Sequence, residues 1–121
     1  MKIYNATIKD VAIGLYGNNK RFGVKLVFCD QENIIRHTFE LTDWTAVSQL
    51  TTLMNFLEIS DLKDLEGKNI RVVVSNGLFR GFGHPEKDRF MAISYFAGRC
   101  PMTLNAKEFE EMLKNHLDYW H

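Results

Sequence analysis

The chain has 121 residues, of which 45% are hydrophobic and 25% are charged, a composition typical of a folded globular protein. This length suits one hydrophobic core, so we expect a single domain over residues 1–121. Fifteen basic residues balance fifteen acidic ones, and this formal net charge of zero argues against nucleic acid as the partner.

The sequence shows no signal for membrane insertion or export. No apolar run approaches the 18 residues of a membrane span, and Met1–Asn5 lacks the pattern of a signal peptide. We therefore expect a cytoplasmic protein without membrane contact. In that reducing compartment, Cys29 and Cys100 are expected to be free thiols.

The first forty residues predict three strands. Apolar residues alternate with polar ones over residues 4–8, and the phase flips over residues 11–15, which predicts a β-bulge near Lys9–Asp10. Polar turns at 17–20 and 30–33 separate this strand from the next two. The inner faces of those two strands carry the apolar residues and one histidine: Phe22, Val24, Leu26 and Phe28, then Ile35, His37, Phe39 and Leu41. Short turns of this kind predict an antiparallel meander.

The apolar period then becomes that of a helix. Thr42 is predicted to cap a helix with apolar positions Val47, Leu50, Met54 and Leu57. A solvated connector over residues 60–68 leads to an apolar strand at 70–74, which suits the centre of a sheet. Asn76–Gly77 predicts a tight turn after it.

A strand at about 89–97 and a second helix complete the predicted fold. Asn105 and Glu108 form a capping box, and the apolar stripe of this helix runs to the end of the chain. Its members are Phe109, Met112, Leu113, His116, Leu117 and Trp120. The order β-β-β-α-β-β-α predicts an α+β fold in which two amphipathic helices pack on one face of a mostly antiparallel sheet.

A glycine-rich segment between residues 79 and 89 is the candidate binding site. Glycines let backbone amides approach a ligand, aromatic rings stack on a base, and guanidinium groups bind phosphate. Residues 78–99 contain four basic and two acidic side chains, a local charge of +2. The predicted ligand-binding residues are Phe79, Arg80, Phe82, His84, Lys87, Arg89 and, from the following loop, Arg99.

A second interpretation of this segment stays open. Phe79 and Phe82 can instead fill the core of an irregular hairpin whose charges are solvated. The run Arg80–Gly83 also matches the first four positions of the RNA-recognition-motif signature. His84 and Pro85 then stand where an aromatic and an aliphatic residue belong, which argues against that fold.

The chemistry-bearing residues predict no metal site, no cofactor and no catalysis. The histidines (His37, His84, His116 and His121) form no metal-binding pair with each other or with a cysteine. Cys100 lies beside Arg99, which would lower the pKa of a thiol, but no flanking motif indicates a nucleophile. The carboxylates gather in the 58–66 connector and on the last helix, where charge is normally solvated.

Two stretches resemble short phage and prophage proteins. Asp64–Val72 is similar to their "W-E-D-L-x-G-K-x-I-R-V" segment, and Gly83–Phe90 is similar to "I-G-H-x-x-K-D-x-W-F". Asn5–Val11 also resembles their opening strand, whereas their "G-F-G-G-Y" run is replaced here by His37–Leu41. The last helix, from Asn105 onward, has no counterpart in the pattern. The group is similar to the Thoeris anti-defence proteins.

That resemblance implies a non-enzymatic phage counter-defence protein. It would act as a homo-oligomer in the host cell and sequester a small nucleotide signal, of the cyclic ADP-ribose type or a cyclic oligonucleotide. One alternative is an inhibitor that binds a host defence protein such as a CRISPR nuclease, using the acidic connector as a mimic of nucleic-acid charge. Another is single-stranded nucleic-acid binding through Arg80 and Phe82, against which the zero net charge argues.

Overall fold

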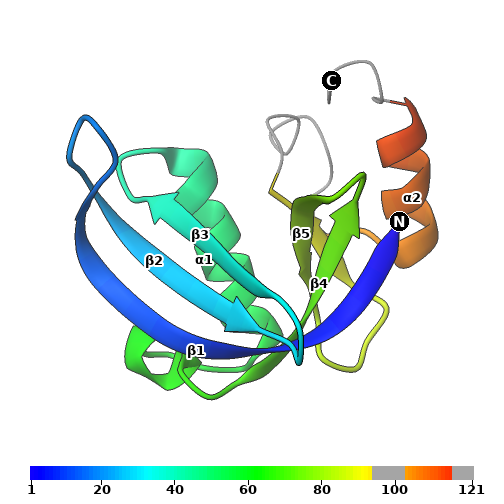
Figure 1. The fold of residues 1–121 in the computed structure, drawn as a ribbon, viewed down its shortest axis with the longest axis horizontal. Helices are drawn as coiled ribbons and strands as arrows, with labels where there is room; N and C mark the ends of the chain where they lie inside the picture. The colour runs from blue at the N-terminus through cyan, green and yellow to red at the C-terminus, as the bar shows by residue number, and fades with distance from the viewer. Residues whose placement is uncertain (94–102, 116–121) are drawn as a thin grey trace.

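The structure, a computed structural model, describes residues 1–93 and 103–115. The elements in chain order are β1 (Lys2–Tyr16), β2 (Arg21–Cys29), β3 (Ile34–Glu40), α1 (Trp44–Phe56), the 3₁₀ helix η1 (Leu62–Leu65), β4 (Asn69–Ser75), β5 (Leu78–Gly83), β6 (Phe90–Ala92) and α2 (Ala106–Asn115). Figure 1 shows a curled sheet with the two α-helices at separate positions around it.

The six strands form one antiparallel sheet in the order β3-β2-β1-β4-β5-β6. β1 joins the two halves of this sheet because it changes partner along its length. Its residues Lys2–Thr7 pair with β4, whereas Thr7–Tyr16 pair with β2. The register shifts between Ile8 and Asp10, which confirms the predicted bulge and lets the strand bend between the two halves.

The α+β class and the antiparallel sheet are confirmed, but the two helices cover different faces of the β4–β6 part. Val72 belongs to the larger core cluster with Leu53 and Phe56 of α1. Its neighbour Val73 belongs to a second cluster with Phe109 of α2. Successive strand residues point to opposite faces, so a strand that is apolar on both faces needs two covers. The prediction that both helices pack on one face is therefore wrong for this part of the sheet.

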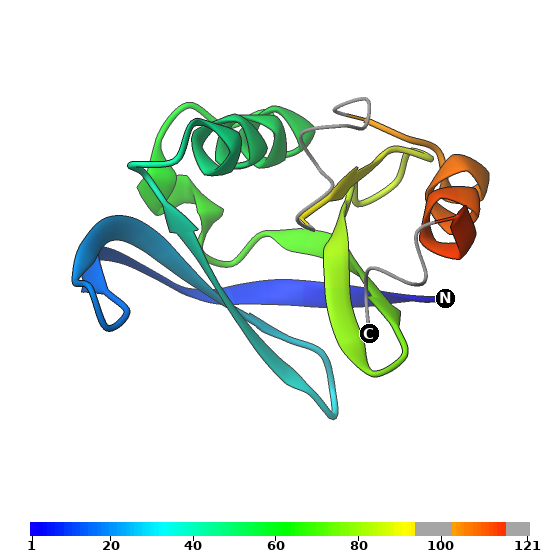
Figure 2. The ribbon, with the colours of Figure 1, turned by 90° about the horizontal axis from the view of Figure 1, so that it is seen from above.

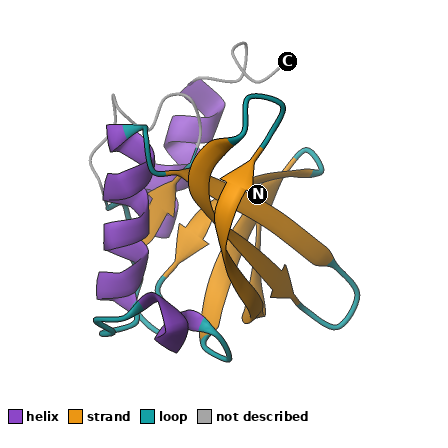
Figure 3. Cartoon of the chain, turned by 90° about the vertical axis from the view of Figure 1, so that its left-hand side faces the viewer, coloured by secondary structure: helices purple, strands orange, loops and turns teal. Residues whose placement is uncertain are grey.

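Two views show this arrangement. In Figure 2, the yellow strand β6 lies between α1 and α2. Figure 3 shows α1 alongside the sheet with η1 close to one of its ends. The buried members of α1 are Gln49, Leu50, Leu53 and Phe56, and those of α2 are Phe109, Met112 and Leu113.

The helix starts follow capping chemistry. The side chain of Asp43, rather than the predicted Thr42, caps α1 by accepting a hydrogen bond from the Thr45 amide at 2.9 Å. The predicted capping box of α2 is confirmed: the Asn105 side chain accepts from the Glu108 amide at 2.8 Å, and the Glu108 carboxylate accepts from the Asn105 amide at 2.9 Å.

Two predicted segments differ from the observed ones. Leu78–Gly83, expected to be an irregular glycine-rich segment, is the strand β5. The strand expected at about 89–97 is Phe90–Ala92, and residues 94–97 lie outside the described part of the chain. The same applies to His116, Leu117 and Trp120 of the predicted apolar stripe. The 60–68 connector contains η1, whose Leu65 is fully buried.

Candidate functional site

A β-bulge at Arg80 determines where the aromatic residues of β5 point. Val74 of β4 lies opposite Phe79 and Val73 lies opposite Gly81, so Arg80 is an extra residue with no partner of its own in the ladder. The extra residue brings Phe79 and Phe82 onto the same face, with their ring centroids 4.9 Å apart. Phe82 is fully buried and Phe79 packs against the same core cluster. Phe82 therefore has no exposed face on which a base could stack.

The bulged residue Arg80 is itself buried, with only 5% of its surface exposed. Its Nε donates a hydrogen bond to the carbonyl oxygen of Ser75 at 3.3 Å, across the Asn76–Gly77 turn. Burial lowers the pKa of the Arg80 guanidinium from its ordinary value. Arg80 therefore stabilises the hairpin as a buried residue, and its guanidinium is not exposed to a ligand in solution.

The glycines of β5 make room for core aromatics. A Cβ on Gly81 would lie 2.9 Å from Cζ of Phe109 and would also overlap the carbonyl oxygen of Met91. A Cβ on Gly83 would overlap the ring of Phe90. Close packing of α2 and β6 therefore requires glycine at these positions, whereas the sequence interpretation had assigned them to ligand approach.

The loop of residues 84–89, between β5 and β6, is held by hydrogen bonds from its own histidine and from β4. The ring nitrogen Nδ1 of His84 accepts hydrogen bonds from the amides of Glu86 and Lys87, at 3.0 and 2.9 Å. Nε of Arg71, on β4, donates to the carbonyl oxygen of His84 at 2.7 Å, and its Nη2 donates to that of Lys87. The Arg71 guanidinium also lies over the ring of Phe90, 4.8 Å from its centroid.

Asp88 connects the same loop to α2. Its carboxylate accepts a hydrogen bond from the amide of Ala106, the first residue of α2, at 2.7 Å. A carboxylate at this end of a helix is stabilised by the free amides and by the helix dipole. Several residues of the Gly83–Phe90 stretch thus have structural roles. Gly83 leaves space for the Phe90 ring, His84 accepts hydrogen bonds from the amides of the turn, and Asp88 accepts one from the first amide of α2.

Two hollows, of about 280 and 390 Å³, adjoin this loop. Phe56, Glu58, His84 and Lys87 line both of them. The smaller is completed by Thr52, Asn55, Arg89 and Thr103, and the larger by Leu57, Lys68, Asn69, Pro85 and Glu86. Three cations (Lys68, Lys87 and Arg89) face two carboxylates (Glu58 and Glu86), so the lining carries a net charge of +1.

His84 is a neutral hydrogen-bond donor in this setting. Burial, followed by the positive charge of Lys87, holds the pKa of His84 below its ordinary value. Nδ1 accepts two amides, so the proton of the neutral ring is on Nε2. Lys87 and Arg89 are exposed, and neither forms an ion pair within residues 1–93 and 103–115.

The seven predicted site residues therefore separate into groups. His84, Lys87 and Arg89 lie together on one loop and line one hollow. Arg80 is buried in the hairpin, and Phe79 and Phe82 pack in the core. Phe82 has no contact with solvent. Arg99 lies outside the described residues, as does Cys100.

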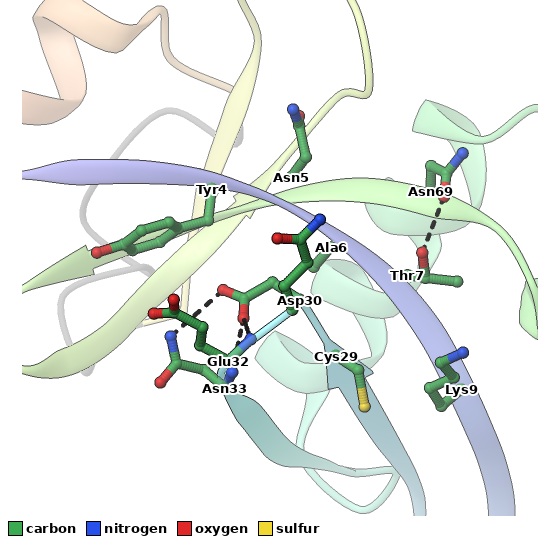
Figure 4. Close-up of a pocket in the computed structure, with 11 residues that line it drawn as sticks. Tyr4, Asn5, Ala6, Thr7, Lys9, Cys29, Asp30, Glu32, Asn33 and Asn69 are labelled. Carbon is green, nitrogen blue, oxygen red and sulfur yellow. Dashed lines mark hydrogen bonds between the residues drawn. The ribbon is translucent and has the colours of Figure 1, made fainter.

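A larger hollow, of about 600 Å³, was not predicted from the sequence. It lies where β1 leaves β2, beside the turn that joins β2 to β3 (Figure 4). Its lining is mostly polar: Tyr4, Asn5, Ala6, Thr7, Lys9, Cys29, Asp30, Gln31, Glu32, Asn33 and Asn69. The Asp30 carboxylate accepts from the amides of Glu32 and Asn33, and these bonds lower the pKa of Asp30. Asp30 thus serves the turn, and the polar turn at 30–33 was the only sequence signal for this site.

Two further features are absent from the described residues. Within residues 1–93 and 103–115, no group of three or more His, Cys, Asp or Glu side chains is arranged to hold a metal ion. No helix in these ranges is long and apolar enough to cross a membrane.

Comparison with known proteins gives no relative. No protein-family model matches the chain, and neither a curated protein nor a solved structure matches it. The likeness to short phage proteins therefore stays a prediction from the sequence.

Proposed function

We propose that this protein is a non-catalytic binding protein that holds a small phosphate-bearing molecule at the 84–89 loop. The observation that carries the proposal is the rigid loop itself, which presents Lys87, Arg89 and the Nε2–H of His84 beside two hollows. Because Arg71 and His84 already fix the loop, little conformational entropy is lost when a ligand binds.

The three groups suit a phosphate in different ways. The Lys87 ammonium supplies a compact positive charge, and the Arg89 guanidinium can donate two parallel hydrogen bonds to phosphate oxygens. Neutral His84 supplies one N–H donor. A guanidinium plane also stacks on a base, so Arg89 takes the stacking role that the sequence had assigned to Phe79 and Phe82, which pack in the core.

The same geometry favours binding over catalysis. A general base needs a free lone pair within reach of the proton that it removes. Neutral His84 has none, because Nδ1 accepts two amides and Nε2 carries its proton. His84 therefore does not act as a base on a ligand held between Lys87 and Arg89, and we propose that the ligand is retained unchanged. Retention of this kind is what sequestration of a signal requires, and a nucleotide immune signal is the ligand that the phage-protein resemblance implies.

Isothermal titration calorimetry tests the proposal with a defined set of probes: cyclic ADP-ribose isomers, cyclic dinucleotides, ADP and inorganic pyrophosphate. We expect heat with at least one nucleotide, and the nucleotide recovered unchanged after incubation. Lys87→Ala and Arg89→Ala should each weaken binding by about tenfold or more, since a charge-assisted hydrogen bond contributes about 1.5–3 kcal/mol. Lys63→Ala, an exposed cation on η1 away from both hollows, should bind as the unaltered chain does. Absence of heat with every probe would contradict the proposal.

A further inference from the structure

The second half of β1 has an unpaired edge. Beyond Thr7, the pairing of β1 with β4 ends, and the last backbone bonds on that side join Ile8 to Gly67 and Lys68. From Asp10 to Tyr16 only the other edge is paired, with β2. In Figure 1 this part of β1 forms the outer contour of the sheet. In the described residues no strand pairs with this edge, so its backbone N–H and C=O groups are open to a further strand.

Beyond the bulge at Ile8–Asp10, the edge carries neither a proline nor a charged side chain that would keep strand edges apart. No charged residue occurs between Asp10 and Lys20. Ile13 and Leu15 are 55% and 63% exposed. They lie on the sheet face of their cross-strand partners on β2, the buried Val24 and the exposed Phe22. Soluble proteins usually protect such an edge with lysine, proline or a covering segment. An uncharged, apolar edge of this length therefore indicates a partner.

The residues of the edge match a second copy of themselves. When two β1 strands pair antiparallel about a twofold axis at Ile13, Ile13 faces Ile13, and Val11 of each copy faces Leu15 of the other. A register shifted by two residues in one direction places Leu15 opposite Lys9, and in the other direction it places Val11 opposite Gly17. Only the register centred on Ile13 matches both apolar pairs, and apolar cross-strand pairs stabilise a sheet.

The opposite face of the strand offers complementary charge in the same register. Asp10 of one copy faces Tyr16 of the other. The ammonium of Lys25 lies 5.2 Å from the centre of the Tyr16 ring in its own chain. Each Asp10 carboxylate therefore approaches the tyrosine hydroxyl and the lysine of its neighbour. The twofold axis would repeat this contact, so this register would place two opposite-charge pairs in the interface.

We propose that the protein forms a symmetric dimer by antiparallel pairing of the β1 edges over Asp10–Tyr16, which joins the two sheets into one. The association is moderate, because a seven-residue edge buries less than the roughly 1,600 Å² of a standard interface. The dimer is independent of the proposed ligand site, which lies on the β5–β6 loop.

Sedimentation velocity on the full chain over a concentration series tests the proposal. We expect the mass to rise from 14.1 kDa towards twice that value. Ile13→Glu should keep the chain monomeric at all concentrations, with unchanged circular dichroism because the side chain is exposed. Ile34→Glu is the matched control: Ile34 is 60% exposed on β3, the other edge strand, and this variant should dimerise normally.

Cysteine crosslinking tests the register without relying on the glutamate variant. In a chain with Cys29→Ser and Cys100→Ser, Ile13→Cys should form a disulfide-linked dimer under mild oxidation, and Ile34→Cys should not. A purely monomeric chain at about 200 µM, far above a micromolar Kd, would overturn the proposal. It would equally be overturned if Ile34→Glu abolished association and Ile13→Glu left it intact.

Discussion

Phe79 and Phe82 lie on the same face of β5 with their rings 4.9 Å apart, although a spacing of three would place them on opposite faces of a regular strand. The bulge at Arg80 corrects the phase, and both rings join Phe28 in the core. This arrangement turns the expected ligand-stacking residues into part of the hydrophobic core. It also limits the exposed binding groups of the segment to the 84–89 loop.

Truncation of these two rings should reveal their different burial. Phe82→Ala should lower the free energy of unfolding by about 3–5 kcal/mol, because it removes a fully buried ring. Phe79→Ala should have a smaller effect, since Phe79 is partly exposed. Urea unfolding followed by circular dichroism measures both. A loss below about 1 kcal/mol for Phe82→Ala would contradict the core assignment.

Adding one methyl group at Gly81 should be destabilising. Gly81→Ala places a Cβ against Phe109 and the Met91 carbonyl, and overpacking of this kind costs about 1–3 kcal/mol. Gly14→Ala is the control within the same sheet, because a Cβ there meets only the Tyr16 ring at ordinary contact distance, 3.5 Å from its oxygen. Thermal melts of the two variants should differ in that order. Equal melting temperatures would show that α2 does not pack against β5 as described.

Stability should fall as the pH is lowered from 6.5 towards 4. His37 lies among aromatic rings, 4.6 Å from Phe39 between ring centroids, and burial lowers the pKa of His37 to about 4. The unfolded chain binds a proton near pH 6.5, whereas the folded chain resists it, so acid favours unfolding. At pH 5 the loss should be about 2 kcal/mol, from 1.4 kcal/mol per pH unit.

Replacement of that histidine provides the comparison. His37→Phe retains an aromatic ring in the cluster and removes the titrating group. The difference between its unfolding free energies at pH 7 and pH 5 should be clearly smaller than that of the unaltered chain. An identical acid dependence in the two proteins would assign the effect to other groups, such as His84, whose pKa is also lowered by burial.

Most of the fold could be predicted from the local periodicity of apolar residues in the sequence. The phase flip after Ile8 gave the β1 bulge, and the Asn105–Glu108 pair gave the start of α2. The strand β5 was missed because glycine is disfavoured in strands. The glycines of β5 are required by contacts with Phe109 and Phe90, which lie further along the chain and are not part of the local pattern. The Arg80 bulge was missed for a related reason: a bulge is visible in sequence only when alternation is regular on both sides.

The candidate site was predictable only in part. His84, Lys87 and Arg89 are neighbours in the sequence, so their proximity followed from the local cluster. The hydrogen bond from Arg71 to the loop depends on strand register, and the presence of Phe56 and Glu58 in the lining depends on helix placement. No local sequence pattern specifies either of them. The hollow beside the β2–β3 turn likewise arises because β1 changes partner at Thr7.

The most direct test of the proposed function is to locate a bound phosphate by amide NMR. ADP titrated into isotopically labelled protein should shift the amide signals of His84, Lys87 and Arg89, together with those of Phe56 and Glu58 across the hollow. The Lys87→Ala variant should show clearly smaller shifts at the same ADP concentration. Shifts centred instead on Cys29–Asn33, in the hollow of Figure 4, would contradict the assignment of the binding site to the 84–89 loop.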